Sequence, residues 1–184
     1  MKRKVILGIT GASGHVYARN MVDLLLKTEQ VEELAIIFSE NGKRVWDYEK
    51  TDKLPENKKI KLFKHDDLFA PPSSGSAMYT DMLVLPCSAG SMARIASGIA
   101  DNLIARAADV MLKERRNLIL AVREAPYSLI HLKNMTKCTS AGAIVFPLSP
   151  FFYHHPKEIK DLVESLNTRI LSLLDLGDPQ IKWS

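Results

Sequence analysis

Two glycines and a serine follow the first apolar run of the chain, in the segment Thr10-Gly11-Ala12-Ser13-Gly14. Glycine permits a tight turn, and a helix that begins just after such a turn leaves its first N–H groups without partners. Negative charge placed there also gains about 0.3–1 kcal/mol from the helix dipole. The segment lacks the full Gly-x-Gly-x-x-Gly spacing of dinucleotide sites. It therefore predicts a phosphate-bearing ligand and favours a mononucleotide.

Arg123 and Glu124 form a second candidate cluster, directly after the apolar run 118–122. Successive strand residues point to opposite faces, so these two side chains diverge while both reach the same edge of a sheet. An arginine there can hold a phosphate, and a carboxyl group beside it can move a proton. A plain ion pair explains the two residues equally well from position alone.

Arg106 and Lys113 lie two turns apart on one face of a predicted helix that is otherwise rich in apolar residues. The two cations could bind an anion. Asp109 lies between them, three residues after Arg106 and four residues before Lys113. Spacings of three and four residues place side chains together on a helix. The pattern therefore slightly favours a ladder of salt bridges over a binding site.

The cysteines and histidines show no catalytic or metal-binding spacing. Cys87 and Cys138 form no ligand pair and no disulfide framework, which is typical of a reduced cytoplasm. Cys87 has no evident histidine base, so a small buried residue at a strand end is favoured over a nucleophile. His131 is interpreted as a helix residue with a satisfied ring. No metal is expected.

Composition limits the class of protein. The chain has 184 residues, 46% of them apolar and 25% charged, which suits one soluble domain. The net charge of +4 would suit nucleic acid or small anionic substrates. The basic run at 58–65 is the obvious nucleic-acid candidate, but no nucleic-acid motif accompanies it, and an edge strand protected by lysines is favoured. No run approaches the ~20 residues of a membrane span, and no signal peptide is recognised.

Short apolar runs separated by helical patterns predict the elements that must position these residues. The runs cover 5–9, 34–38, 82–85, 118–122 and 143–146, and helices are expected over 15–28, 42–49, 102–116, 127–140 and 157–176. Continuous apolar runs joined by helices are typical of buried parallel strands. We predict an α/β fold: a three-layer, doubly wound, Rossmann-like and mostly parallel sheet, forming a single domain over 1–176 with a C-terminal tail at 177–184.

In such folds the ligand binds at the carboxyl ends of the strands. Those ends are predicted at 10–14, 39–41, 86–91, 123–126 and 147–155. They are rich in hydroxyl groups and contain the Arg123–Glu124 pair, but they contain no Ser-His-Asp arrangement. The ligand edge therefore offers phosphate binding and proton transfer rather than serine nucleophilic catalysis.

Several of these segments, in their joint order and spacing, resemble the UbiX-type flavin prenyltransferases, which belong to the flavin-binding, cysteine-decarboxylase-like fold group. The similarity covers nearly the whole chain. It is carried by 10–14, by Ala-Pro-Pro-Ser-Ser-Gly-Ser at 70–76, by Pro-Cys-Ser at 86–88, by 106–110 and 112–116, by Arg-Glu-Ala-Pro at 123–126 and by Phe-Tyr-His at 152–154.

The resemblance implies a metal-independent transferase. It would transfer a dimethylallyl group from dimethylallyl phosphate to N5 and C6 of reduced FMN, and a UbiD-type decarboxylase would receive the prenylated FMN. The resemblance also implies a homo-oligomer, specifically a dodecamer. Neither a nucleic-acid partner nor a membrane span is expected, and the predicted location is cytoplasmic.

The resemblance also implies roles for individual residues. FMN would contact Gly11, Ala12, Ser13, Ser39, Ser88, Ala89, Gly90, Ser91 and Arg123. The substrate would contact Tyr153 and Arg169, with Lys113 and Arg106 nearby. Glu124 would be the acid–base residue, and Ser13, Glu49 and Lys113 would complete the catalytic set. Trp183 has a counterpart in the family, and the tail around it would pack on a neighbouring subunit.

One departure from the family concerns a tryptophan that many relatives carry just before the Ala-Pro-Pro loop. Here Leu68 and Phe69 stand in that region. An aromatic face there could shelter positive charge that develops on the allylic group. Phe69 could replace it, or the flavin ring and the departing phosphate could supply most of the stabilisation.

Two other functions stay open. An FMN-dependent cysteine decarboxylase would share the fold, but its Pro-x-Met-Asn segment is not found in this chain. A non-catalytic flavin carrier would need no phosphate-binding groups beyond those serving FMN, so the surplus cations and Tyr153 argue against it. Both alternatives predict that dimethylallyl phosphate neither binds nor reacts.

Overall fold

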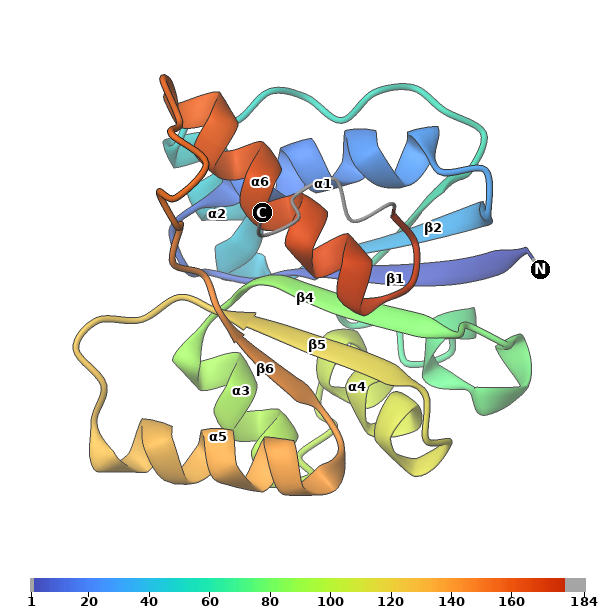
Figure 1. Cartoon of the computed structure of the whole chain (residues 1–184). Coiled ribbons are helices and arrows are strands. Elements are labelled where there is room, and N and C mark those ends of the chain that lie inside the picture. The colour runs from blue at the N-terminus through green and yellow to red at the C-terminus, as the bar shows by residue number, and fades with distance from the viewer. Residues whose placement is uncertain (1, 178–184) are drawn as a thin grey trace.

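The computed structural model describes residues 2–177. Their core is one six-stranded sheet in the order β3-β2-β1-β4-β5-β6, and every neighbouring pair of strands is parallel (Figure 1). The strands are β1 (Arg3–Ile9), β2 (Val31–Phe38), β3 (Ile60–Phe63), β4 (Asp81–Cys87), β5 (Asn117–Val122) and β6 (Ile144–Pro147). The predicted doubly wound α/β fold is confirmed.

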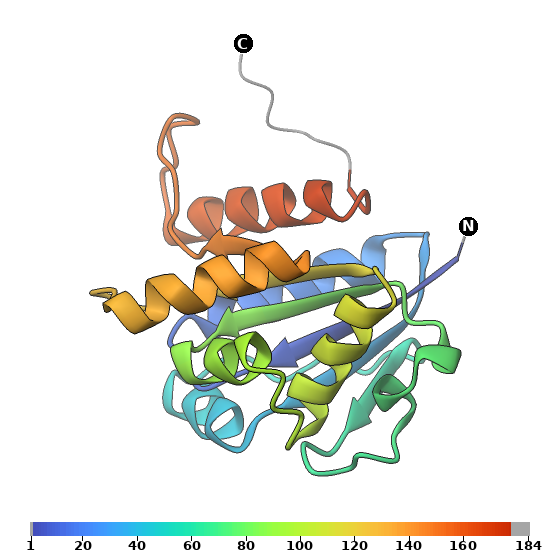
Figure 2. The same cartoon turned by 90° about the horizontal axis from the view of Figure 1, so that it is seen from below.

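Helices cover both faces of the sheet, which makes three layers (Figures 1 and 2). On one face lie α1 (His15–Lys27) and α6 (Ile159–Leu173), and α2 (Glu40–Tyr48) adds Trp46 to the same core. On the other face lie α3 (Ala89–Ala96), α4 (Leu103–Lys113) and α5 (Leu129–Ala141). No helix within residues 2–177 is both long and apolar enough to cross a bilayer.

Strand β1 shows why the sheet must be covered on both sides. Val5, Leu7 and Ile9 belong to the core under α1 and α6, whereas Ile6 belongs to the core under α4. All four side chains are fully buried. Alternate residues of a strand face opposite ways, so a strand that is buried on both faces is a continuous apolar run.

The strand order reverses between β1 and β4. From β1 the chain builds outward to β2 and β3, then returns to place β4 on the other side of β1, where Val5 pairs with Asp81 and Gly8 pairs with Val84. Ligands of open α/β sheets bind where the order reverses, outside the carboxyl ends of the strands. Residues 10–14 and 88–91, which follow β1 and β4, lie at this point.

The lysine-bearing segment at 58–65 contains β3, an edge strand of the sheet, as predicted. Helix α3 was not predicted. It is only eight residues long and begins with Ala89, Gly90 and Ser91, of which glycine and serine are weak helix formers. The side chain of Ser88 accepts a hydrogen bond from the N–H of Ser91 and so starts the helix.

Candidate functional site

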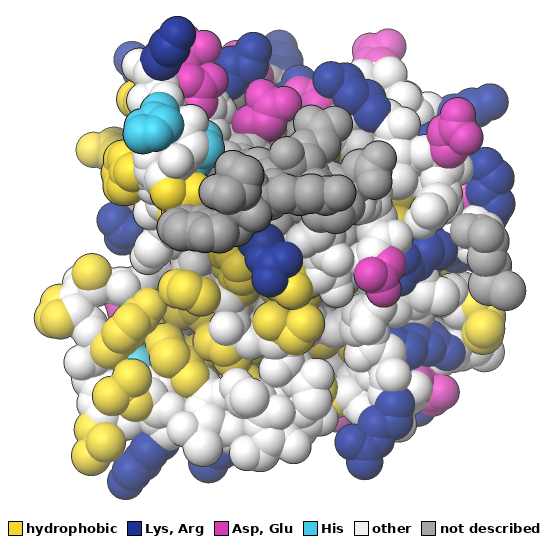
Figure 3. Space-filling model, viewed as in Figure 1, with side chains coloured by type: hydrophobic (Ala, Val, Ile, Leu, Met, Phe, Trp, Pro, Cys, Tyr) yellow, Lys and Arg dark blue, Asp and Glu magenta, His cyan; other side chains and the backbone are white. Residues whose placement is uncertain are grey.

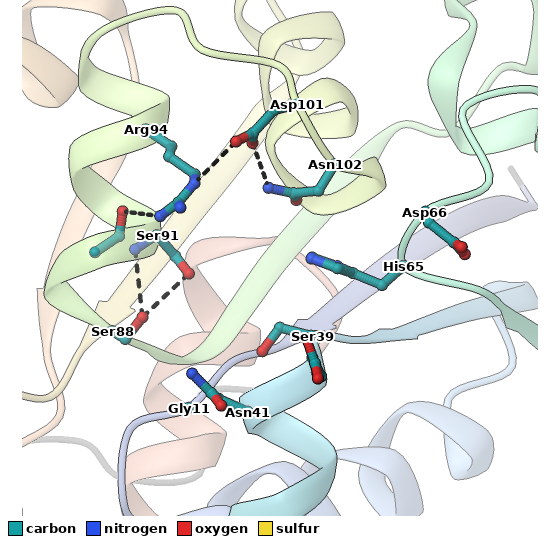
Figure 4. Close-up of a pocket in the computed structure, with 12 residues that line it drawn as sticks. Gly11, Ser39, Asn41, His65, Asp66, Ser88, Ser91, Arg94, Asp101 and Asn102 are labelled. Atoms are coloured by element: carbon teal, nitrogen blue, oxygen red, sulfur yellow. Dashed lines mark hydrogen bonds and ion pairs between the residues drawn. The ribbon is translucent and has the colours of Figure 1, made fainter.

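A cavity of about 460 Å³ opens at the reversal point of the sheet (Figure 4). Its lining comes from the loop after β1, from the beginnings of α2, α3 and α4, and from the segment after β3. The lining residues are Gly11, Ser39, Glu40, Asn41, His65, Asp66, Ser88, Gly90, Ser91, Arg94, Asp101 and Asn102. Segments far apart in sequence thus form one polar cavity.

Three helix N-termini border this cavity, and each is capped by a polar side chain. Ser39, Ser88 and Asn102 each accept a hydrogen bond from the backbone N–H three residues later, at 2.9, 3.3 and 3.0 Å. A cap satisfies one N–H and leaves the partial positive charge of the helix end in place. The cavity is therefore suited to an anionic group that also accepts hydrogen bonds from hydroxyls.

Thr10 joins the two loops at the carboxyl ends of β1 and β4. Its hydroxyl donates to the carbonyl of Pro86 at 2.7 Å and accepts from the N–H of Ser88 at 2.8 Å. Nε2 of the fully buried His15 lies 2.9 Å from the carbonyl oxygen of Thr10. These bonds fix the loop at 10–14 relative to the beginning of α3.

The glycines of the cavity are of two kinds. A Cβ added to Gly11 would lie 2.7 Å from the Cβ of Asn41, so a side chain at position 11 would displace the beginning of α2. A Cβ added to Gly90 would meet only the guanidinium of Arg94, at 3.8 Å. Gly11 therefore permits the close approach of the turn after β1 to Asn41, whereas the backbone at Gly90 leaves open space.

Glu49 lies just beyond the C-terminus of α2 and caps α1 instead. Its carboxylate accepts hydrogen bonds from the N–H groups of Gly14, at 3.1 and 3.2 Å, and of His15, at 2.9 Å. Burial tends to raise the pKa of Glu49, but hydrogen bonds from Ser13, His15 and Gly14 outweigh it and lower the pKa overall. The N–H groups at the beginning of α1, which were predicted to bind an anionic ligand, thus have this carboxylate as their partner. The cavity lies instead beside the beginnings of α2 and α3.

The predicted FMN contacts divide into two groups. The structure brings Gly11, Ser39, Ser88, Gly90 and Ser91 together around the cavity. Ala12, Ser13, Ala89 and Arg123 are not among its lining residues. Ala12 is buried, Ser13 bonds to Glu49, and Arg123 is exposed beyond the end of β5.

Arg123 and Glu124 directly follow β5, which ends at Val122. Glu124 is partly buried, and its carboxylate accepts a hydrogen bond from the N–H of Ala125 at 3.1 Å. The backbone N–H of Arg123 donates to the carbonyl of Cys87 at 3.1 Å. No ion pair joins the two side chains in the described part of the chain, so the simple ion-pair interpretation is wrong.

Arg106 and Lys113, the two cations predicted on α4, each form an ion pair with an acidic residue close by in the sequence. Arg106 binds Asp109 at 2.9 Å and the carbonyl of Ser73 at 3.2 Å, whereas Lys113 binds Glu114 at 2.6 Å rather than Asp109. The predicted ladder is therefore confirmed at one of its two rungs. Helix α4 begins at the cavity and carries Lys113 about 15 Å away along its axis, at a rise of ~1.5 Å per residue.

The other two predicted substrate contacts also lie away from the cavity lining. Tyr153 stacks on Phe151 with ring centroids 4.9 Å apart, and it is about half exposed. Arg169 projects from α6 and donates to the hydroxyl of Ser172 at 3.1 Å. One copy of the chain therefore does not bring the predicted substrate cations to the cavity.

The family tryptophan has no counterpart at the cavity. Phe69 is fully exposed and Leu68 is 42% exposed, and neither lines the cavity. Phe69 therefore does not shelter an allylic group within one copy. Trp183 and the rest of the predicted tail beyond Gly177 lie outside the described residues.

The interpretations of Cys87 and His131 are confirmed. Burial raises the pKa of the Cys87 thiol far above its usual range, so the thiol stays protonated and unreactive. Nδ1 of His131 accepts a hydrogen bond from the N–H of Ser128 at 3.2 Å, which satisfies the ring. Among residues 2–177 no three His, Cys, Asp or Glu side chains are grouped to hold a metal ion.

Sequence reasoning missed five residues that line the cavity: His65, Asp66, Arg94, Asp101 and Asn102. Asn102 carried a usable signal, since an asparagine before an amphipathic helix is a typical N-cap. His65 comes two residues after β3, which ends at Phe63, but that strand was predicted only as a lysine-protected edge and not as part of the ligand edge. Arg94 follows no strand end, and only the tertiary arrangement brings it to the cavity.

A doubly wound parallel sheet with a polar cavity at its reversal point is typical of nucleotide-binding α/β proteins. A family model described as Flavoprotein matches residues 1–171, and the chain belongs to this family.

Relatives of known structure or function place the chain more closely. It is 41% identical over 181 residues to the flavin prenyltransferase UbiX of Thermoplasma acidophilum, and the alignment covers 97% of this chain and 98% of the relative. A crystal structure of AnUbiX (PadA1) in complex with FMN and dimethylallyl pyrophosphate superposes with a TM-score of 0.90 at 38% identity, covering 100% of both chains. A dodecameric FMN-dependent UbiX-like decarboxylase from Escherichia coli O157:H7 gives a TM-score of 0.89 at 34% identity, covering 98% of this chain and 99% of that one.

Proposed function

We propose that this protein is a flavin prenyltransferase that transfers a dimethylallyl group from dimethylallyl phosphate to reduced FMN. The observation that carries the proposal is the cavity at the reversal point, where five of the FMN contacts implied by the family resemblance come together. The similarity to flavin prenyltransferases extends over nearly the whole chain.

The residues at the cavity suit FMN. Hydroxyl groups of Ser39, Ser88 and Ser91 stand at the beginnings of α2 and α3, where the helix ends favour the flavin phosphate. The space over Gly90 admits the ligand close to the backbone. Reduced FMN, when bound, supplies the nucleophilic atoms N5 and C6.

Proton transfer is assigned to Glu124, with Ser13 and Glu49 as the second acid–base group. Glu124 comes two residues after the end of β5, on the ligand edge of the sheet, and within residues 2–177 its carboxylate accepts one hydrogen bond, from the backbone N–H of Ala125. Ser13 bonds to Glu49, which places a hydroxyl and a carboxylate side by side at the turn after β1. Groups of this kind can remove a proton from the flavin as the second bond forms.

We assign the stabilisation of the leaving phosphate to four residues and to no metal ion: Arg106, Lys113, Arg169 and Tyr153. Charge-assisted hydrogen bonds to such cations contribute roughly 1.5–3 kcal/mol each. These residues do not reach the cavity of their own chain, and Lys113 stands at the far end of α4. We therefore infer that neighbouring copies contribute some of them, in a homo-oligomer such as the dodecamer of the Escherichia coli O157:H7 relative.

The surface supports such an assembly. Exposed apolar side chains gather over α5 and β6 on one face of the molecule (Figure 3). They include Tyr127, Leu129, Ile130, Leu132 and Ile144, which are between 40% and 70% exposed. A patch of this kind typically marks a protein–protein interface.

The proposed function also implies a partner enzyme and a cellular location. A UbiD-type decarboxylase would receive the prenylated flavin. We infer a cytoplasmic location, because the thiols of Cys87 and Cys138 are free and buried and no disulfide framework is predicted.

Anaerobic incubation with FMN, dimethylallyl phosphate and a reductant, followed by mass analysis of the extracted flavin, tests the proposal. A mass gain of one five-carbon isoprenoid unit that depends on dimethylallyl phosphate is expected. Bound but unmodified FMN would contradict the proposal and favour the cysteine decarboxylase or the flavin carrier. Failure to bind FMN at all would contradict all three functions.

A further inference from the structure

The cavity contains an arginine that the family resemblance does not assign. Arg94 lies in the second turn of α3 and lines the cavity, close to the beginning of α4 (Figure 4). Its Nε donates to Asp101 at 3.3 Å, and its Nη1 donates to the carbonyl of Gly90 at 3.3 Å. Asp101 in turn accepts a hydrogen bond from the side chain of Asn102 at 2.8 Å. The guanidinium is thereby held beside the cavity.

The charges around the cavity make this arginine important for an anion. Three acidic residues, Glu40, Asp66 and Asp101, line the same cavity. His65 is the other basic lining residue, and burial lowers its pKa, so the imidazole is mostly neutral at pH 7. Among the described residues that line this cavity, Arg94 is the one with a permanent positive charge.

The guanidinium also has donors to spare. Both of its hydrogen bonds are long, and its Nη2 group has no hydrogen-bond partner within residues 2–177. A planar guanidinium can present two parallel N–H groups to a phosphate, which a lysine cannot do. The hydroxyl of Ser88 donates to that of Ser91, which leaves the O–H of Ser91 as a further donor on the same side of the cavity.

We propose that Arg94 binds the phosphate group of FMN and makes the cavity selective for FMN over riboflavin. The inference rests on the proposed function, because it assumes that the cavity holds the phosphate end of the flavin. Asp101 acts as a positioning residue that keeps the guanidinium at the cavity before the ligand arrives. The competing interpretation is a surface ion pair that merely joins α3 to the beginning of α4.

Equilibrium binding of FMN and of riboflavin to the full-length protein distinguishes these interpretations. Arg94→Gln is expected to weaken FMN binding about tenfold, a moderate loss because the side chain is half exposed and therefore screened. It should leave riboflavin binding unchanged, since riboflavin has no phosphate. Arg94→Lys keeps the charge but not the two parallel N–H groups, and should recover only part of the lost FMN affinity.

Lys58→Gln provides the matched control, because it removes the same charge from an exposed position before β3, away from the cavity. It should leave the affinity for both flavins unchanged. Equal FMN affinity in wild type and Arg94→Gln would overturn the inference. An equal loss for both flavins would also overturn it, because that result indicates a structural ion pair.

Steady-state kinetics at saturating FMN show whether Arg94 binds the phosphate of FMN or that of dimethylallyl phosphate. Arg94→Gln should leave the KM for dimethylallyl phosphate unchanged. A raised KM with unchanged FMN affinity would overturn the inference by assigning Arg94 to the second substrate. If wild-type protein bound neither flavin, the proposed function itself would fail, and that result is distinct from every outcome for Arg94.

Discussion

The carboxylate of Glu49 accepts hydrogen bonds from the backbone N–H of Gly14, so a residue that follows α2 caps the beginning of α1. The contact joins segments 35 residues apart. It also places a carboxylate within reach of Ser13, at the turn that follows β1. A structural cap and a proposed acid–base pair therefore share one side chain.

Glu49→Gln should reduce the loss of stability on acidification. The pKa of Glu49 is below its ordinary value of 4.5 in the folded protein. Its stabilising contribution is therefore complete above about pH 4.5 and is lost as the pH falls through the lowered pKa. Urea unfolding between pH 7 and pH 3.5 should show a shallower decline for Glu49→Gln than for wild type. Glu56→Gln, at an exposed position, should decline like wild type, and parallel curves for all three proteins would contradict the prediction.

Glu124→Gln should separate flavin binding from prenyl transfer. The substitution keeps the size of the side chain but removes the group that accepts a proton. FMN affinity should stay within about twofold of wild type, while formation of the cyclised product slows by a factor of ~10²–10⁴. Mass analysis of the flavin over time measures both bonds. Glu32→Gln, on exposed β2 surface, should be fully active, and cyclised product at the wild-type rate in Glu124→Gln would refute the assigned role.

Gly11→Ala and Gly90→Ala should differ although both enlarge a glycine at the cavity. The added methyl at position 11 would meet Asn41 at 2.7 Å, and such overpacking typically costs about 1–3 kcal/mol. At position 90 the nearest atom is 3.8 Å away, and alanine is a better helix former than glycine. Thermal unfolding should show a lower Tm for Gly11→Ala and an equal or higher one for Gly90→Ala. The reverse order would contradict the geometry described here.

Arg3→Ala should destabilise the fold strongly, although Arg3 lies far from the cavity. Its guanidinium binds the fully buried carboxylate of Asp81 and also donates to the carbonyl of Leu174. Removing one member of a buried ion pair leaves the other charge without its partner, which typically costs about 3–5 kcal/mol. Lys2→Ala, at an exposed neighbouring position, should cost little. Similar urea midpoints for the two variants would show that Asp81 does not need Arg3.

Much of this site was predictable because it follows strand ends. Ser39 and Ser88 come directly after apolar runs, and parallel strands place their carboxyl ends at one edge of a sheet. Arg94 carries no such signal. It lies on a short helix that begins with residues of low helix propensity, and its relation to Asp101 depends on how α3 packs beside α4.

The sequence by itself determined the parallel sheet, most of its helices and strands, and most of the segments that meet at the ligand edge, because burial on both faces demands continuous apolar runs. Only the tertiary structure decided that Glu49 caps α1, and that Arg94 rather than Lys113 stands at the cavity. Charged side chains on helices have the same local pattern whether they face solvent or a cavity. Packing between helices, which the local pattern does not encode, determines which of them a ligand can reach.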